Sequence, residues 1–285
     1  MADLGALLTA IVTPFDVEGR VDEDAFVTLQ RHLCEHGSDG VVVAGTTGES
    51  PTLQDDEHLR LVELAARERP PGSIVIAGAG SNDTRHAVKL TERATALGAD
   101  AILSVTPYYN RPSPRGMLRH FEEVARATDL PVVLYNIPSR TGTDMSNELL
   151  ARLAEIDGID AVKQANPANL ALVDGLELYA GNDDLLAPTL DLGGRGGICV
   201  ASHVLGAEFR AMIDEPEHRT EIHDALQDAF LVLGAFNPVS IKAALNLVGL
   251  PAGGLRLPLV EADEDQVDRI RAVLEHHGLV GATAR

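Results

Sequence analysis

Short, almost continuously apolar runs recur along the chain, and stretches with a helical spacing of apolar residues separate them. Such runs are typical of parallel strands that are buried on both faces of a sheet. They recur at intervals of roughly 30 residues, the length of one strand–helix unit, although the later intervals are shorter. The pattern predicts eight strands, at residues 7–12, 41–44, 74–77, 101–105, 132–135, 159–163, 177–180 and 197–200.

The stretches between these runs predict helices. Apolar residues three or four positions apart form one stripe on a helix, and one such stripe consists of Ala87, Leu90, Ala94 and Leu97. Ser146 has the side chain of a good N-cap and precedes another stretch of this kind. Thr52 and Asp55 have the spacing of a capping box at the start of a third.

Eight strand–helix units predict an α/β fold, a (β/α)8 barrel of the TIM type. We expect residues 1–214 to form this barrel as the catalytic domain, and residues 215–285 to form a C-terminal helical extension packed on it. The extension contains three predicted helices, at roughly 217–234, 238–248 and 263–277. A doubly wound sheet is less well supported, because no glycine-rich first turn is followed by an acidic residue about 20 positions later.

The composition limits the partners. The 285 residues include 43 acidic and 23 basic side chains, for a formal net charge of −20, so we expect neither nucleic acid nor an anionic membrane as a partner. The longest apolar runs are far shorter than the roughly 20 residues of a membrane span, and Asp3 stands where a signal peptide has a basic start. With only two cysteines there is no disulfide framework. These features predict a cytoplasmic protein.

The residues at the ends of the predicted strands, and those directly after them, are rich in chemically useful side chains. A barrel of this type builds its active site where the strands end. Three of the four tyrosines and one of the three lysines fall there. The candidate site residues at this rim are Thr46, Thr47, Tyr109, Tyr135, Arg140, Lys163 and Gly181. Scattered surface residues would not gather in this way, so the rim is the predicted catalytic centre.

Lys163 is the candidate nucleophile. It ends an apolar strand, and lysine is rarely buried unless it is paired or functional. Burial lowers the pKa of a lysine and yields the neutral amine that attacks a carbonyl carbon. The alternative is a lysine that simply reaches solvent. Lys89 and Lys242 lie beside the apolar stripes of helices, and we expect both to be solvated.

Four further side chains can support that amine. Tyr135 ends the neighbouring strand, where its phenol can transfer protons. Thr46 and Thr47 lie in a glycine-flanked turn whose N–H and hydroxyl groups can hold a carboxylate. The guanidinium of Arg140 suits bidentate carboxylate binding. Each of these side chains also has an ordinary structural explanation. Their grouping at one rim favours a catalytic role over that explanation.

The sequence predicts neither a metal nor an organic cofactor. The ten histidines form no His-Glu-x-x-His pair, and there is no Cys-x-x-Cys. Cys199 and His203 lie four positions apart but lack further ligands. Asp183 and Asp184 are expected to begin a helix, because carboxylates are favoured at the N-terminal end of the helix dipole.

Four motifs resemble those of a known family: Gly45-Thr-Thr-Gly-Glu-Ser-Pro-Thr-Leu53, Thr106-Pro-Tyr-Tyr-Asn-Arg-Pro112, Tyr135-Asn-Ile-Pro-Ser-Arg-Thr-Gly142 and Asn237-Pro-Val-Ser-Ile-Lys-Ala-Ala-Leu245. With almost the whole chain around them, they resemble the dihydrodipicolinate synthases. That family belongs with the N-acetylneuraminate lyases among the class I, lysine-dependent pyruvate aldolases. The resemblance implies a homotetramer built from dimers.

The resemblance also implies a reaction and its catalytic residues. Pyruvate and aspartate semialdehyde would condense to 4-hydroxy-tetrahydrodipicolinate, the committed step towards diaminopimelate and lysine. Lys163 would form a Schiff base with pyruvate. Tyr135, Thr46 and, from a neighbouring subunit, Tyr109 would relay protons.

Substrate binding follows from the same resemblance. Thr47 would help to bind the pyruvate carboxylate, and Gly181 and Ile198 would line the pocket. Arg140 would bind the carboxylate of aspartate semialdehyde.

The chain departs from the family pattern directly after Lys163. Gln164-Ala-Asn-Pro-Ala-Asn169 stands where an acidic residue and a short Ala/Gly-rich turn are usual. Because side chains alternate along a strand, Gln164 should point away from the Lys163 side, and we expect the chemistry to survive.

A second departure concerns feedback inhibition by lysine at an interface site. His58, Asn82 and Tyr108 match the pattern of that site. Asp55 and His86 stand where a His and a Glu are usual. The resemblance therefore does not predict that lysine inhibits this protein.

Two alternatives stay open. A related pyruvate aldolase or dehydratase could act on a sugar acid, and an inactive paralogue could bind a keto acid as a sensor or scaffold. Arg140 suits a short aldehyde that bears a carboxylate, which favours the synthase. The intact set of Lys163, Tyr135, Thr46 and Tyr109 argues against the inactive paralogue.

Overall fold

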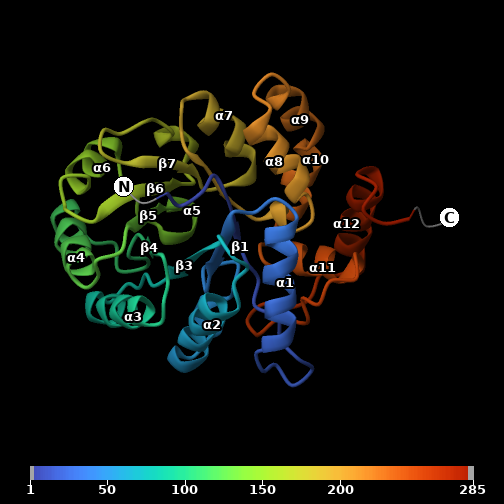
Figure 1. The fold of residues 1–285 in the computed structure, drawn as a ribbon, viewed down its shortest axis with the longest axis horizontal. Coiled ribbons are helices and arrows are strands. Elements are labelled where there is room, and N and C mark those ends of the chain that lie inside the picture. Colours follow the sequence, from blue (N-terminus) through green and yellow to red (C-terminus); the bar gives the residue numbers. More distant parts are fainter. Residues whose placement is uncertain (1–2, 282–285) are drawn as a thin grey trace.

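The eight strands close into one parallel barrel in a computed structural model that describes residues 3–281 (Figure 1). Each strand pairs with its neighbour in sequence, and β8 pairs with β1. The predicted fold is therefore confirmed, and no predicted strand end differs from the observed one by more than two residues. The strands are β1 (Leu7–Ala10), β2 (Gly40–Val43), β3 (Ile74–Gly78), β4 (Ala101–Val105), β5 (Val132–Asn136), β6 (Ile159–Gln164), β7 (Glu177–Ala180) and β8 (Gly196–Cys199).

Alternation along the strands separates two apolar cores. Ile76 of β3 belongs to the core inside the barrel, together with Leu103. The preceding residue, Val75, packs with Ile102 in the larger core between the barrel and its helices. Because side chains fill the barrel interior, a substrate site can form only beyond the strand ends.

The helices that surround the barrel are α1 (Glu23–Glu35), α2 (Asp55–Glu68), α3 (Thr84–Ala96), α4 (Pro114–Arg126), α6 (Asn147–Leu153), α7 (Leu186–Asp191) and α8 (Gly206–Asp214). The predicted N-cap of α6 is confirmed, because the Ser146 side chain accepts the Leu149 N–H. The predicted capping box of Thr52 and Asp55 is wrong. Thr52 ends a 3₁₀ helix, η1 (Ser50–Thr52), and the capping box joins Gln54 and Glu57 instead.

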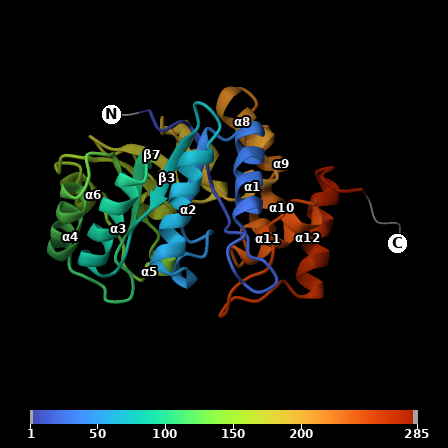
Figure 2. The ribbon, with the colours of Figure 1, turned by 60° about the horizontal axis from the view of Figure 1, so that its bottom comes forward.

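The C-terminal helices pack on one side of the barrel, beside α1 and α8 (Figures 1 and 2). They are α9 (Arg219–Ala225), α10 (Gln227–Leu233), α11 (Val239–Leu247) and α12 (Glu264–His276). The single helix predicted at 217–234 is two, because the backbone of Leu226 (φ −98°, ψ 6°) leaves helical geometry. Phe230 of α10, after this break, belongs to the larger apolar core. Within residues 3–281, no helix is long and apolar enough to cross a membrane.

Candidate active site

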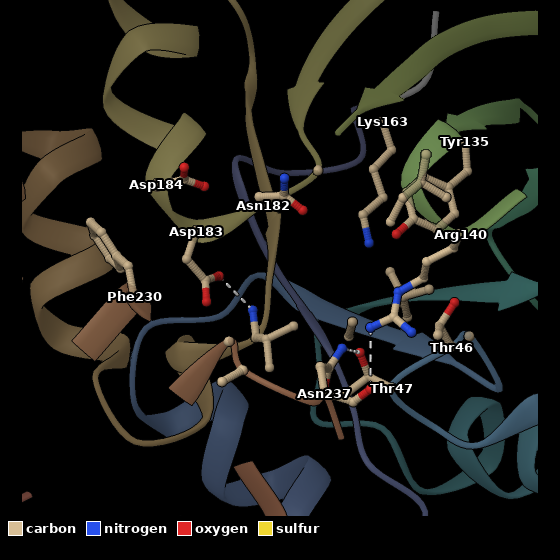
Figure 3. Close-up of a pocket in the computed structure, with 18 of the residues that line it drawn as sticks. Thr46, Thr47, Tyr135, Arg140, Lys163, Asn182, Asp183, Asp184, Phe230 and Asn237 are labelled. Atoms are coloured by element: carbon tan, nitrogen blue, oxygen red, sulfur yellow. Dashed lines mark hydrogen bonds between the residues drawn. The ribbon is translucent and has the colours of Figure 1, made fainter. Parts of the chain in front are cut away.

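A pocket of about 540 Å³ opens at the C-terminal ends of the strands (Figure 3). Six of the eight predicted site residues line it: Thr46, Thr47, Tyr135, Arg140, Lys163 and Gly181. These residues come from β5, β6 and the loops after β2, β5 and β7, so only the closed barrel brings them together. The pocket therefore lies at the rim where the sequence predicts the catalytic centre.

Lys163 points into this pocket from β6 (Figure 3). Its side chain is buried, and only 5% of the residue is exposed, so the solvated alternative does not apply. Burial lowers the pKa of its amine to about 8. A much larger fraction of the amine is therefore neutral near physiological pH than for a solvated lysine.

Tyr135 is the partner of Lys163 across the β5–β6 ladder. The Lys163 Nζ atom lies 4.3 Å from the centre of the Tyr135 ring. Burial raises the pKa of the Tyr135 phenol to about 12. The phenol therefore stays protonated and can both donate and accept a hydrogen bond beside the amine.

The Thr46–Thr47 turn faces Lys163 across the pocket (Figure 3). Thr47 Oγ1 is 2.9 Å from the Asn237 Nδ2 atom, which donates to it, and Arg140 Nη2 donates to the Asn237 carbonyl at 3.2 Å. Asn237 thus joins the hydroxyl and the guanidinium that are predicted to hold carboxylates. No role for Asn237 could be predicted from the sequence, although this residue opens one of the four motifs, because its place at the rim depends on how the C-terminal helices pack.

Asp183 is a second residue of the pocket lining that was not among the predicted site residues. It does begin a 3₁₀ helix, η3 (Asp183–Leu185), as expected. Its buried carboxylate also accepts the N–H groups of Val200 and Ala201, at 2.7 and 2.9 Å, and so holds the chain that leaves β8. Burial raises the pKa of this carboxyl. Phe230 and Leu231 of α10 complete the wall, so the C-terminal helices form part of the site.

Two of the predicted residues lie outside the pocket lining. Tyr109 is 89% exposed, in a left-handed backbone conformation (φ 69°). Ile198 is buried in the barrel interior, in the same apolar core as Tyr135. The pocket of one chain therefore contains the predicted nucleophile and carboxylate ligands, while Tyr109 faces outward.

The prediction for Lys242 was wrong, whereas Lys89 is exposed as expected. Lys242 is 1% exposed, and its amine pairs with Glu49 at 2.8 Å. The helical pattern placed it beside the apolar stripe of α11, but the chain around Gly254 covers that side of the helix and supplies a further acceptor.

The departure after Lys163 lies on the outer side of β6. Gln164 Oε1 accepts from Asn136 Nδ2 at 3.1 Å and from the Asn166 N–H at 3.0 Å. Gln164 is fully buried and does not line the pocket. The expected orientation is confirmed, and the pocket surface is unaffected by this side chain.

A second cavity of about 300 Å³ adjoins the first at Thr46 and Arg140. Four residues of the predicted lysine-site positions line it: Asp55, His58, His86 and Tyr108. The two substituted positions contact each other, with His86 Nε2 2.9 Å from Asp55 Oδ1. Asp55 and His86, the two residues that differ from the family pattern of the lysine site, therefore form a pair with each other.

Known proteins resemble this chain in both sequence and fold. Residues 3–277 match the dihydrodipicolinate synthetase family. The 4-hydroxy-tetrahydrodipicolinate synthase of Moorella thermoacetica is 43% identical over 290 residues, covering 97% of this chain and 99% of that one. The crystal structure of DHDPS from Cyanidioschyzon merolae with lysine bound has a TM-score of 0.93 at 40% identity and covers 97% and 99% of the two chains. The chloride-inhibited dihydrodipicolinate synthase from Acinetobacter baumannii complexed with pyruvate has a TM-score of 0.92 at 34% identity, with 97% and 100% covered.

Proposed function

The chain belongs to the dihydrodipicolinate synthetase family, and from the geometry of its pocket we propose how it carries out the reaction. The enzyme is a lyase of lysine biosynthesis that forms 4-hydroxy-tetrahydrodipicolinate from pyruvate. Its second substrate in our proposal is L-aspartate 4-semialdehyde. The observation that carries the proposal is the buried Lys163 amine beside the Tyr135 phenol, in a pocket that also contains Thr47 and Arg140.

Lys163 performs the first covalent step. Its neutral amine attacks the keto carbon of pyruvate, the keto oxygen leaves as water, and an imine joins Lys163 to the substrate. Tyr135 stays protonated because burial raises its pKa to about 12. It can therefore protonate the departing oxygen, with Thr46 as the next group of the relay.

The second step forms the carbon–carbon bond. The imine acidifies the pyruvate methyl group, whose proton passes to the Tyr135–Thr46 relay and leaves an enamine. The enamine carbon attacks the aldehyde carbon, and the aldehyde oxygen takes a proton from the relay and becomes the 4-hydroxyl group of the product. The amino group of the semialdehyde then attacks the imine carbon, which closes the ring and releases the Lys163 amine. Arg140 binds the carboxylate of the semialdehyde, while the Thr47 hydroxyl contacts the carboxylate of pyruvate.

The charge of the chain makes a local positive group necessary. The net charge is −20, and the carboxylates of both substrates are repelled by such a field. Among the described residues, Arg140 is the only arginine in the pocket lining. Its side chain is exposed, so the guanidinium is open to an incoming anion. We assign it the attraction of substrate as well as its orientation.

The position of Tyr109 supports an oligomer. Its side chain is almost fully exposed on one chain, so in our proposal it reaches the pocket of a neighbouring subunit and completes the proton relay there. The assembly we propose is a homotetramer built from dimers, in the cytoplasm.

A coupled assay with purified enzyme tests the substrates. Pyruvate with aspartate semialdehyde should give product, and pyruvate with a panel of sugar aldehydes should give much less. Faster turnover of any sugar aldehyde would contradict the assignment of the second substrate.

A further inference from the structure

We propose that the buried ion pair of Lys242 and Glu49 positions the Thr46–Thr47 turn for pyruvate binding. Neither residue lines the pocket, so both act through the turn and not on the substrate. This inference rests on the proposed function, which gives Thr47 the carboxylate of pyruvate.

The pair is a fully satisfied polar anchor. The side chains of Lys242 and Glu49 are 2% and 0% exposed. The three N–H donors of Lys242 point to Glu49 Oε1 at 2.8 Å, the Thr13 carbonyl at 2.7 Å and the Gly254 carbonyl. The other carboxylate oxygen of Glu49 accepts the Arg256 N–H at 3.1 Å. A buried ion pair of this kind fixes one geometry, because any displacement leaves a charge without a partner.

Glu49 transmits this geometry to the turn. It lies two residues after Thr47, and its N–H donates to the Thr46 carbonyl at 3.0 Å. Its backbone is left-handed, with φ 55°. A non-glycine residue keeps that conformation only where its surroundings hold it. Thr13 links Lys242 to the turn, because its hydroxyl donates to the carbonyl of Gly48, the residue before Glu49, at 2.7 Å while its own carbonyl accepts from Lys242.

Lys242 links the ion pair to Asn237, which lies in the pocket wall. Lys242 lies on α11, which begins directly after Asn237 and Pro238. Asn237 donates to Thr47 Oγ1 and accepts from Arg140, so the segment from Asn237 to Lys242 is bonded to the turn region at two points, Asn237 to Thr47 and Lys242 to Glu49. Without the ion pair of Lys242 and Glu49, the turn and Asn237 are free to shift relative to Lys163. A displacement of binding groups by about 1 Å can lower the rate of an enzyme about a hundredfold.

Lys242→Met and Glu49→Gln are the test variants, and Lys89→Met is the matched control at an exposed lysine. We expect the KM for pyruvate to rise about tenfold or more in Lys242→Met, and less in Glu49→Gln, which keeps an acceptor for the amine. The control should keep the KM of the parent enzyme. Borohydride should still trap pyruvate on Lys163 at saturating pyruvate in all three.

The KM separates positioning from folding. A purely structural pair would lower the melting temperature and the fraction of active enzyme, but the active molecules would keep the parent KM. An unchanged KM in folded Lys242→Met therefore overturns the proposal. If that variant does not fold, because it leaves the Glu49 carboxylate buried and unpaired, an unchanged KM in Glu49→Gln overturns it. Absence of trapping in the parent enzyme would instead refute the proposed function.

Discussion

The amine of Lys163 lies 4.3 Å from the centre of the Tyr135 ring, and the two residues are direct partners across β5 and β6. Burial disfavours the charged form of both groups, so it moves their pKa values apart, to about 8 for Lys163 and about 12 for Tyr135. In water a lysine is the weaker acid of the two by a small margin. In this pocket the lysine is the group that loses its proton, which separates a nucleophile from an acid.

The pH dependence of imine formation follows from the lowered pKa of Lys163. The neutral amine is the reactive form, so the trapping rate should rise with pH up to about 8 and level off above it. Well below that pH it should fall about tenfold per pH unit. Borohydride trapping at short times with pyruvate measures this rate, with Lys163→Arg as the unreactive control. A rate that keeps rising to the pKa of a solvated lysine would show that the amine is hydrated.

Substitution of Arg140 should separate the two substrates. Arg140→Ala should lower kcat/KM for aspartate semialdehyde roughly ten- to a hundredfold, because charge-assisted hydrogen bonds to its carboxylate are lost. The rate of imine formation with pyruvate should change much less. Arg140→Lys, which keeps the charge without the planar fork, should give an intermediate loss. Equal losses for both substrates would mean that the bond to Asn237 is the main role of Arg140.

Removal of the Tyr109 hydroxyl should slow the enzyme although the residue faces away from its own pocket. Tyr109→Phe should lower kcat about a hundredfold or more, as for other losses of a proton-transfer group. Sedimentation of the parent enzyme should show a tetramer. A fully active monomer would refute both the assembly and the role of Tyr109.

A methyl group at Gly181 should be poorly tolerated. A Cβ atom there would lie 2.8 Å from the backbone nitrogen and the Cβ of Ala165, atoms that cannot move independently of the strand end. Gly181→Ala should therefore destabilise the fold by about 1–3 kcal/mol and raise the KM for pyruvate. Gly116→Ala is the control, because its Cβ would meet only Pro112 and Ser113, at 3.4 and 3.6 Å. It should stabilise α4 by about 0.5–1 kcal/mol. Chemical denaturation of both variants measures the difference.

Lysine should leave the activity unchanged. Asp55 and His86, which stand where the family pattern has a His and a Glu, pair with each other at 2.9 Å in the second cavity, so neither of the usual side chains is present to hold a lysine. The exchange Asp55→His with His86→Glu restores the usual residues at both positions and should introduce inhibition. Initial rates against lysine concentration compare the two enzymes, and strong inhibition of the parent enzyme would contradict the prediction.

Most of the fold could be predicted from the sequence because its signals are local. Apolar runs at strand length and helical stripes depend on neighbours in the chain, and they gave eight strands in the observed order. Lys163, Tyr135 and Arg140 could be predicted as candidates as well, because they lie at or just after the ends of those strands and a barrel gathers its strand ends at one rim. The break at Leu226 was missed, since no glycine or proline marks it.

The tertiary structure decided which polar groups are buried and what they contact. Lys242 resembles a surface lysine in sequence, yet it meets Glu49, 193 positions away, in the protein interior. Asn237 and Asp183 join the site through hydrogen bonds to Thr47 and to the chain after β8, which no local pattern encodes. Burial depends on the elements that cover a side chain, and those elements are distant in sequence. The sequence by itself therefore determined the barrel and the place of the predicted nucleophile, while the packing of the C-terminal helices decided how the pocket around Lys163 is held.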